Sequence, residues 1–564
     1  MADVLIVGAG PSGLVSALAL ARAGISSRIV ERRNGLGLHP KAHEINARTL
    51  EILRSLDVDV TRLEAEASPP EDGARIVFCR ALAEEIGRLD LLEESIASRY
   101  AEHLRAGVPC LNLSQVTFEE VLRDEVARRP QIELREGMAW CGFADDQRTA
   151  SRLEHRATGR TSTVQHRFLI GADGARSRVR EALDIAMDGP ETLQRFVSCA
   201  FDADLRDHVT TRAKLYWLLH PSAVGTLIAH HVERCWVYHI PFEEGTALED
   251  YDEAFFRERL RIALSGAEPP LHIRSICEWQ MSAQVAKRFS KGPAYLVGDA
   301  AHRFPPTGGL GLNTGVADAH NLAWKLAAVM RDQANPSLLE TYEVERRPVA
   351  LANCTESHTN YDRIFEVAQA VGLPSNSLEI RAIVRRTFKW LPALQRWLLR
   401  ILEGPAHWLV GRGLREGAVR RRAQASIRDQ LPHFDRLGLD IGYVYGQDAP
   451  ADIDRVRDYV PSTCPGARLP HWWLDAERTR STHDLIDVDS FTLLVSDASP
   501  WEAAVATARA AVRAPLRVVP IEAIADLREG ALLVRPDGHI AWRSATSDAS
   551  SQSLLEACRS CHLV

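Results

Sequence analysis

Long apolar runs are missing from this 564-residue sequence, which excludes the protein classes that depend on them. No stretch reaches the ~20 apolar residues that a membrane-spanning helix requires. The first residues, including the acidic Asp3, enter an apolar segment without a preceding basic region, so we expect no secretory signal peptide. An excess of positive charge is also missing. The formal net charge of -7 argues against a nucleic-acid partner or an anionic membrane surface.

Cysteine is scarce as well, with ten residues scattered over the chain. This pattern favours reduced, mostly buried thiols and a cytoplasmic location over a disulfide framework. One pair, Cys558 and Cys561, is followed by His562 and matches the C-x-x-C-H pattern of haem attachment, which is also half of a zinc or redox motif. No second ligand pair lies nearby in the sequence. We therefore interpret the pair as incidental and predict no metal site.

What the sequence does contain begins with a phosphate-binding pattern. The apolar residues 4–7 predict a buried strand that leads into an alanine- and leucine-rich helix. Between them, Gly8, Gly10 and Gly13 follow G-x-G-x-x-G spacing, and Ser12 lies inside the motif. These glycines permit a tight turn, a close approach of a pyrophosphate to the backbone, and close packing of helix on strand. The helix N-terminus attracts the phosphate charge.

Acidic residues after three further predicted strands narrow the choice of nucleotide. Glu31, followed by Arg32, ends the second strand, where a carboxylate accepts hydrogen bonds from the ribose hydroxyls of FAD or NAD. Asp173 and Asp299 each follow a later apolar strand. After Asp299 comes a stretch rich in glycine and proline, and then a helix that we expect to begin near Asn313. An aspartate in the position of Asp299 could bind a ribityl hydroxyl of FAD.

Three motifs together, GAGPSG with Glu31, GADGARS around Asp173 and GDAAHRFPPTGGLGLNTG from Gly298, carry a family resemblance. The chain resembles the group A flavoprotein monooxygenases, of the phenol and chlorophenol hydroxylase type that includes aromatic polyketide hydroxylases. The resemblance implies an α/β fold: a GxGxxG Rossmann-like FAD-binding domain, an interleaved antiparallel-sheet substrate domain and a C-terminal thioredoxin-like domain. The expected order is FAD-binding (1–75, 106–185 and 291–370), substrate domain (76–105 and 186–290), a helical region (371–447) and the thioredoxin-like domain (448–564).

The resemblance also implies which residues contact FAD. They are the positions that match the family motifs: Gly8, Gly10, Ser12, Gly13, Glu31, Arg32, Lys41, Arg48, Gln115, Asp173, Asp299, Pro306, Gly309, Gly311, Leu312 and Asn313. Gln115 is equally compatible with a helix-capping role. The family places one basic residue beside the flavin, and either Lys41 or Arg48 could supply it. We prefer Arg48. Its guanidinium is a planar fork that can donate two parallel hydrogen bonds, whereas the lysine ammonium is a point charge.

Residues 186–290 alternate in polarity like strands, and the family uses such a sheet to cover the flavin. Tyr216, His230, Trp236 and His239 are the candidate pocket residues, with core packing as the alternative for each. The helical region contains Arg385, Arg386 and Arg420–Arg422, which we interpret as a solvated helix face. Beyond 448 the strands and one helix, predicted at 501–512, form a small α/β unit with Asp537-Gly538 as a hairpin turn. This unit has no cysteine pair after its first strand, where a thioredoxin has its catalytic pair, so we expect its role to be structural.

The function implied by the resemblance is hydroxylation of a small phenolic or polycyclic aromatic substrate by O2 through a flavin C4a-hydroperoxide. NADPH or NADH would bind transiently as reductant, with Arg176 and Arg180 as candidate contacts, since no second glycine motif is present. The protein would be a monomer or a homodimer. Baeyer-Villiger oxygen insertion and epoxidation are alternatives that use the same chemistry. A redox-silent FAD-binding protein is the non-enzymatic alternative.

Overall fold

The computed structural model describes residues 3–37, 39–243, 245–371, 417–447, 453–521, 530–544 and 550–564. Its first sheet has six strands in the order β19 (Ser290–Lys291), β20 (Ala294–Leu296), β11 (Phe168–Gly171), β1 (Val4–Val7), β2 (Ser27–Val30) and β7 (Ile132–Arg135). All neighbours are parallel except the β19–β20 pair. The β1 strand is buried along its whole length, as expected of a strand that helices cover on both faces.

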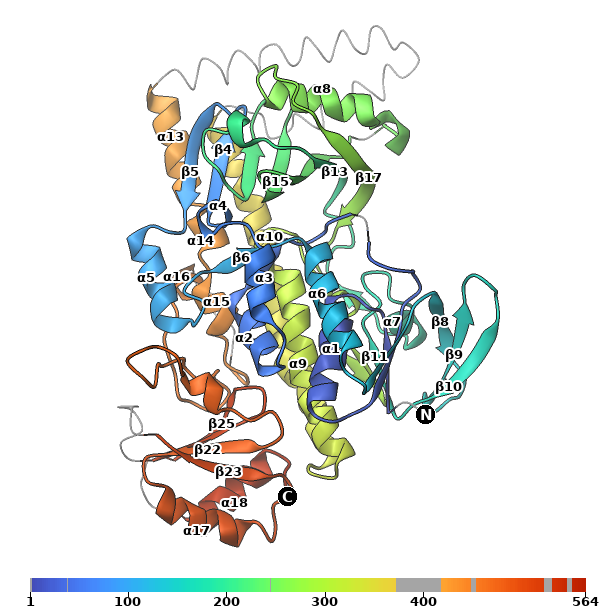
Figure 1. Cartoon of the computed structure of the whole chain (residues 1–564), viewed down its shortest axis with the longest axis vertical. Coiled ribbons are helices and arrows are strands. Elements are labelled where there is room, and N and C mark those ends of the chain that lie inside the picture. Colours follow the sequence, from blue (N-terminus) through green and yellow to red (C-terminus); the bar gives the residue numbers. More distant parts are fainter. Residues whose placement is uncertain are drawn as a thin grey trace.

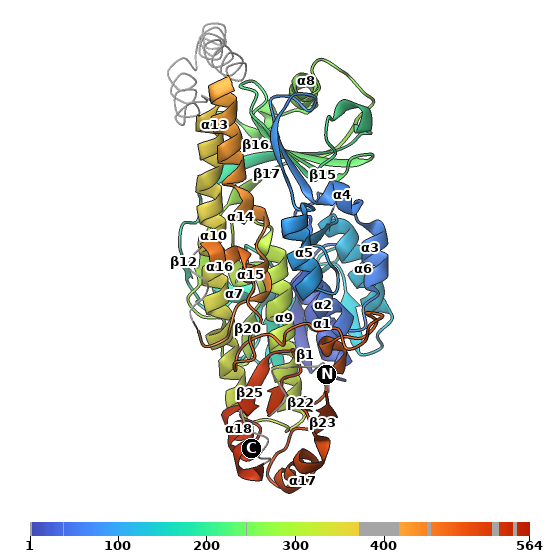
Figure 2. The same ribbon diagram turned by 90° about the vertical axis from the view of Figure 1, so that its left-hand side faces the viewer.

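Four helices pack around this sheet: α1 (Pro11–Arg22), α6 (Gln115–Ala127), α9 (Leu310–Met330) and α10 (Thr341–Ala370). The α1 and α9 helices lie side by side, and their apolar faces share one core with the strands. Figures 1 and 2 show α9 and α10 running along the long axis of the molecule. The α9 helix begins at Leu310, three residues before the start that the sequence predicted.

A second sheet covers the end of the molecule where α10 ends. Its seven strands follow the order β17 (His272–Met281), β13 (Gln194–Asp202), β16 (Cys235–Pro241), β15 (Gly225–His231), β14 (Leu215–Leu218), β4 (Arg75–Cys79) and β5 (Glu85–Asp90). Only β14 and β4 pair in parallel. Segment 75–90 therefore joins a sheet whose other strands lie more than a hundred residues later. Helix α8 (Glu253–Ala263) covers the outer face, and α13 (Gly417–Arg428) lies against β5 (Figure 1).

A small α/β unit lies at the opposite end of the long axis (Figures 1 and 2). It contains β23 (Leu516–Pro520), β22 (Phe491–Val495), β24 (Ala531–Val534) and β25 (Ile540–Ser544), in that order, with α17 (Ala498–Ala508) and α18 (Ser551–Ser560). The predicted helix at 501–512 thus begins and ends a few residues earlier. The Asp537-Gly538 turn connects β24 and β25, with Gly538 at φ 79°. The chain is an α/β protein with the three parts expected of it.

The arginine clusters and the C-terminal cysteine pair were also interpreted from the sequence. Arg420–Arg422 lie exposed on α13, whose Ala423 and Ile427 are buried, in agreement with a solvated helix face. Arg385 and Arg386 fall outside the described residues. Cys558 is buried on α18 and Cys561 is half-buried, both as free thiols. Within the described ranges no cluster of three potential metal ligands occurs, and no helix there is both long and apolar enough to span a bilayer.

Candidate active site

Four polar or glycine positions gather at the carboxyl edge of the six-stranded sheet. Gly8 follows β1, Glu31 follows β2, Asp173 lies just beyond β11, and Asp299 follows β20 in the short helix η3 (Gly298–Ala300). These strands are parallel neighbours, so their carboxyl ends meet at one edge. In open α/β sheets this edge is where ligands bind.

The three glycines of the motif have different reasons to be glycine. Gly8 has φ 107°, and a side chain there would collide with the carbonyl oxygen of Ala172. A side chain at Gly13 would collide with the carbonyl oxygen of Gly8. Gly10, in contrast, has no atom within 4 Å of the place where a Cβ would be. Packing therefore requires Gly8 and Gly13, whereas Gly10 leaves open space at the N-terminus of α1, which no side chain caps.

Glu31 is fixed in an ionised state at this edge. Its carboxylate accepts hydrogen bonds from the backbone N–H groups of Ala9 (3.0 Å) and Arg33 (3.0 Å) and from the Arg33 guanidinium (3.2 Å). Burial alone raises the pKa of Glu31, but these donors outweigh it and the pKa is lowered. The neighbouring Arg32 is exposed. The carboxylate is thus preorganised as an acceptor beside the glycine turn.

Asp299 is exposed and has no hydrogen-bond partner within the described part of the chain. Around it, the Ser12 hydroxyl lies so close to Gly298 and Gly315 that a Cβ at either glycine would collide with it. This contact brings α1, η3 and α9 together. The α9 N-cap is Gly309, at φ 60° and without a side-chain cap. Pro306 is exposed, and no atom lies within 4 Å of a Cβ at Gly311. Leu312 is half-buried.

These features fit FAD. Two long helices direct uncapped N-termini toward the edge, and a glycine turn leaves room for a pyrophosphate. Glu31 and Asp299 are carboxylates, a group that accepts hydrogen bonds from hydroxyls such as those of a ribose or a ribityl chain.

Asp173 holds the turn that follows β11. Its carboxylate accepts hydrogen bonds from the Ser177 hydroxyl and from Val179 N (3.1 Å), which fixes the start of α7 (Arg178–Ala182). Nearby, the buried Arg180 donates to the carbonyl oxygens of Ala175 and Ala300, both at 3.4 Å. Arg180 thus links the Asp173 turn to the Asp299 turn. Arg176 is exposed.

Arg48, our preferred basic residue beside the flavin, has partners within the protein. Arg48 is buried, donates to the carbonyl oxygen of Asp537 (2.8 Å) and pairs with Glu51 (3.2 Å). The turn after β24 therefore occupies it. Lys41 is exposed. The next residue, Ala42, donates a hydrogen bond from its backbone N to the side chain of Gln115 (3.2 Å). The cap of α6 is Ser114, so Gln115 does not have the capping role that was its alternative.

Two pocket candidates lie on the wrong face of the seven-stranded sheet. Tyr216 and Trp236 are fully buried against α8, in the core that contains Phe256. The Tyr216 hydroxyl donates to the carbonyl oxygen of Thr211 (2.9 Å), and the Trp236 indole donates to that of Ala203 (3.2 Å). Alternate residues of a strand face opposite sides, and the sequence could not show which side α8 would cover. We therefore remove both from the pocket.

His239 and His230 lie on the inner face, toward the FAD-binding part. His239 shares this face with polar and aromatic neighbours, which are half-buried except for the buried Ser198. We name this group the inner strip: Ser198, Thr226, His239, Ser275, Cys277 and Trp279. His39, from the loop after β2, contacts the inner strip through Nδ1 and the Ser275 hydroxyl (2.9 Å). His230 lies at the edge of His43, 5.7 Å between ring centroids.

The protonation of His239 follows from its partners. The Trp279 indole donates to His239 Nδ1 (3.3 Å), and the Ser198 hydroxyl also contacts Nδ1. Burial, with His39 and His43 nearby, lowers the pKa of His239 to about 3, so the ring is neutral at pH 7. Because Nδ1 accepts, the proton lies on Nε2, which has no partner among the described residues. Ser198 and Trp279 were not among the residues predicted from the sequence, although strand alternation through 194–202 and 272–281 could have paired them with His239.

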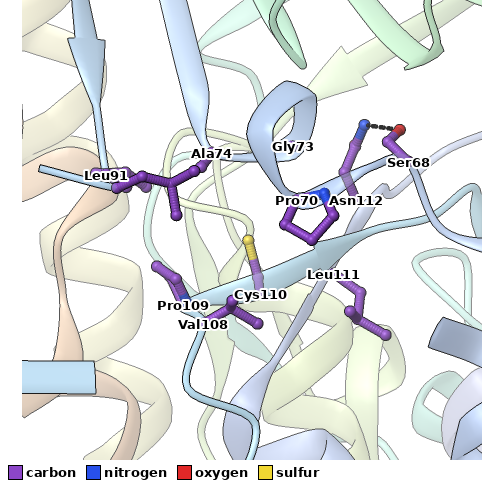
Figure 3. A pocket seen from close by; sticks show the side chains of 11 residues that line it. Ser68, Pro70, Gly73, Ala74, Leu91, Val108, Pro109, Cys110, Leu111 and Asn112 are labelled. Carbon is purple, nitrogen blue, oxygen red and sulfur yellow. Dashed lines mark hydrogen bonds between the residues drawn. The ribbon is translucent and has the colours of Figure 1, made fainter. Parts of the chain in front are cut away.

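A small cavity lies beside β6 (Cys110–Asn112), as Figure 3 shows. Its volume of ≈ 30 Å³ holds roughly two waters, at ~10–15 Å³ each. Pro70, Gly73 and Cys110 are among its lining residues. This cavity is too small for an aromatic substrate.

The sequence matches two family models, one described as FAD binding domain (residues 1–357) and one as aromatic-ring hydroxylase, C-terminal (residues 462–561). The 2,4-dichlorophenol 6-monooxygenase of Cupriavidus pinatubonensis is 32% identical, over 97% of this chain and 94% of its own length. The aklavinone 12-hydroxylase of Streptomyces purpurascens is 32% identical, over 98% and 97%. The structure of the flavin-dependent monooxygenase PieE in complex with FAD and substrate has a TM-score of 0.86 and 31% identity, over 99% of both chains.

Proposed function

The chain belongs to the FAD-dependent aromatic-ring hydroxylases, and from this premise we propose that it hydroxylates a phenolic ring held against the inner strip. It is a monooxygenase with FAD as its cofactor, and NADPH or NADH is the reductant in this family. Bound FAD supplies the activation of O2 and the transfer of one oxygen atom. The protein supplies binding, orientation and the exclusion of water.

For the cofactor, we assign the pyrophosphate to the space at Gly10, the ribose to Glu31 and the ribityl chain to Asp299. The backbone of Gly309, Gly311 and Leu312, with Pro306, would lie against the ring system. The N-terminus of α9 there favours negative charge on the pyrimidine end of reduced flavin. Lys41 takes the role of basic residue that we first gave to Arg48. The domain boundaries predicted from the sequence remain our proposal for how the parts divide.

For the substrate, the contact between His39 and the inner strip carries the assignment, because it brings the FAD-binding part against these side chains. The Trp279 indole offers a face for a planar ring, and His239 Nε2–H offers one donor to a ring oxygen. His230 extends the polar surface toward His43. These groups suit a phenol, a catechol or a hydroxyquinone. The dichlorophenol enzyme, similar over 94% of its length, is named for a phenol.

The test is a screen of chlorophenols and polycyclic hydroxyquinones under ¹⁸O2, with product analysis by mass spectrometry and NMR. We expect substrate-stimulated NAD(P)H oxidation and a product with one ¹⁸O atom as a new ring hydroxyl. A lactone or an epoxide containing ¹⁸O would establish the alternative outcomes. Bound FAD that NAD(P)H does not bleach with any substrate would identify a redox-silent protein. The same preparation, analysed by light scattering, distinguishes a monomer from a homodimer.

A further inference from the structure

A buried group of three charges joins three distant segments. Glu44, in β3 (Glu44–Asn46), pairs through one carboxylate oxygen with Lys214 and through the other with Arg436 (2.8 Å). Lys214 immediately precedes β14 of the substrate sheet, and Arg436 is the N-cap of α15 (Leu437–Ile441). All three side chains are at most 5% exposed. We name Glu44, Lys214 and Arg436 the buried triad.

The buried triad touches the N-terminal turn of α9. The Glu44 carboxylate packs against Gly309, where an added Cβ would collide with it. Asn313, one turn into α9, donates from Nδ2 to the carbonyl oxygens of Glu44 (2.9 Å) and Gly309 (2.8 Å). Asn313 Oδ1 in turn accepts from Asn46 N (3.0 Å). The strand that carries Glu44 is therefore fixed to the turn that we assign to the flavin ring.

Other groups lie around the buried triad. Cys110 Sγ, which also lines the small cavity of Figure 3, is 3.5 Å from Lys214 Nζ. Asp440 Oδ1 is 3.4 Å from Arg436 Nε. Burial raises the pKa of Glu44, but the two cations outweigh this and hold the pKa well below its ordinary value. The cost of removing these charges from water offsets most of their Coulomb attraction. The cluster is therefore better explained by its fixing of one arrangement of the three segments than by a gain in stability.

We propose that the buried triad is a positioning element that links the substrate sheet to the flavin-facing turn of α9 and sets the electrostatic potential there. This inference rests on the proposed FAD site. Lys214, just before β14, and Arg436, at the start of α15, both pair with Glu44, and Glu44 contacts Gly309. In the low dielectric of a buried site, removing one of these charges changes the stability of negative charge on reduced flavin.

The test measures the reduction potential of bound FAD in two variants that change the charge in opposite directions. Lys214→Met removes a cation, so the potential falls. Glu44→Gln removes an anion while keeping the shape, so the potential rises. For each we expect at least a tenfold change in the equilibrium constant of the two-electron couple, about 30 mV. The double variant K214M/E44Q loses one charge of each sign, so its potential returns toward the wild-type value. If one single variant does not fold, the other still tests the sign of its own shift.

Glu51→Gln is the matched control. Glu51 is also buried between two cations, Arg48 (3.2 Å) and Arg468, but it faces the C-terminal segment. This variant lowers the melting temperature and leaves the potential unchanged. If K214M and E44Q shift the potential in the same direction, or neither shifts it, the inference is overturned although the FAD site stands. If wild-type protein binds no FAD, the proposed function itself fails.

Discussion

The glycine turn after β1 and the inner strip of the seven-stranded sheet offer a ligand different kinds of atoms. The turn offers backbone N–H groups and empty space, and its residues are fixed by φ angles and close packing. The inner strip offers side chains, His239 and Trp279 above all, on strands whose backbone accepts many residue types. A site made of backbone leaves a motif in the sequence. A site made of side chains leaves only an alternation that does not tell which face is which.

The largest effect is expected from breaking the turn itself. Gly8→Ala introduces a side chain at φ 107° against the carbonyl oxygen of Ala172, and we expect a loss of more than about 3 kcal/mol of stability in the apo-protein. Gly10→Ala is the matched control, because nothing lies within 4 Å of the added Cβ. It leaves the apo melting temperature within the scatter of neutral substitutions and weakens FAD binding. Equal melting temperatures for the two variants would contradict the division between packing and ligand glycines.

Asp299→Ala comes next. The side chain is exposed and accepts no hydrogen bond in the described part of the protein, so the apo-protein keeps its stability. Losing a charged acceptor for the ribityl chain costs about 1.5–3 kcal/mol, which is roughly a tenfold to hundredfold weaker FAD affinity. Fluorescence titration of apo-protein with FAD measures it. Asp299→Asn keeps an acceptor and should lie between the two. An alanine variant that retains its flavin fully through desalting removes Asp299 from the cofactor site.

A smaller effect separates the two faces of the substrate sheet. His239→Leu removes the Nε2–H donor, and we expect about tenfold less product per NAD(P)H, the value of one hydrogen bond, with unchanged FAD affinity. Tyr216→Phe, on the α8 face, removes a hydroxyl bonded to Thr211 and costs about 1 kcal/mol of stability with unchanged coupling. Product yield against NAD(P)H consumed decides the question. The faces would be assigned wrongly if Tyr216→Phe uncoupled the enzyme and His239→Leu did not.

The glycine turn and the inner strip differ in how well the sequence could predict them. The sequence placed Gly8, Glu31 and Asp299 at strand ends, and in the structure they lie at one edge because parallel strands order their carboxyl ends. The sequence could not show that Arg48 donates to Asp537, because the two residues lie 489 positions apart. Long-range side-chain contacts of this kind leave no local pattern, and the buried triad was invisible for the same reason.

The smallest effect is a dependence of stability on pH near the C-terminal unit. Burial and the nearby Arg48 lower the pKa of His320 to about 3, and burial lowers that of His539 to about 4. Unfolded histidines bind a proton near pH ~6.5, so between there and pH 4 the unfolded chain holds more protons than the folded one. The stability contributed by these histidines is therefore full above about pH 6.5, and it falls as the solution is acidified below that value. Melting temperatures from pH 7.5 to 4.5 test this, and H539Q should flatten the curve. A melting temperature constant over that range would refute it.

The most direct test of the whole account is the absorption spectrum of the purified protein after desalting, before and after NAD(P)H is added with and without a phenolic substrate. We expect one FAD per chain, which NAD(P)H bleaches faster when the phenol is present. A colourless protein that added FAD does not reconstitute would contradict it.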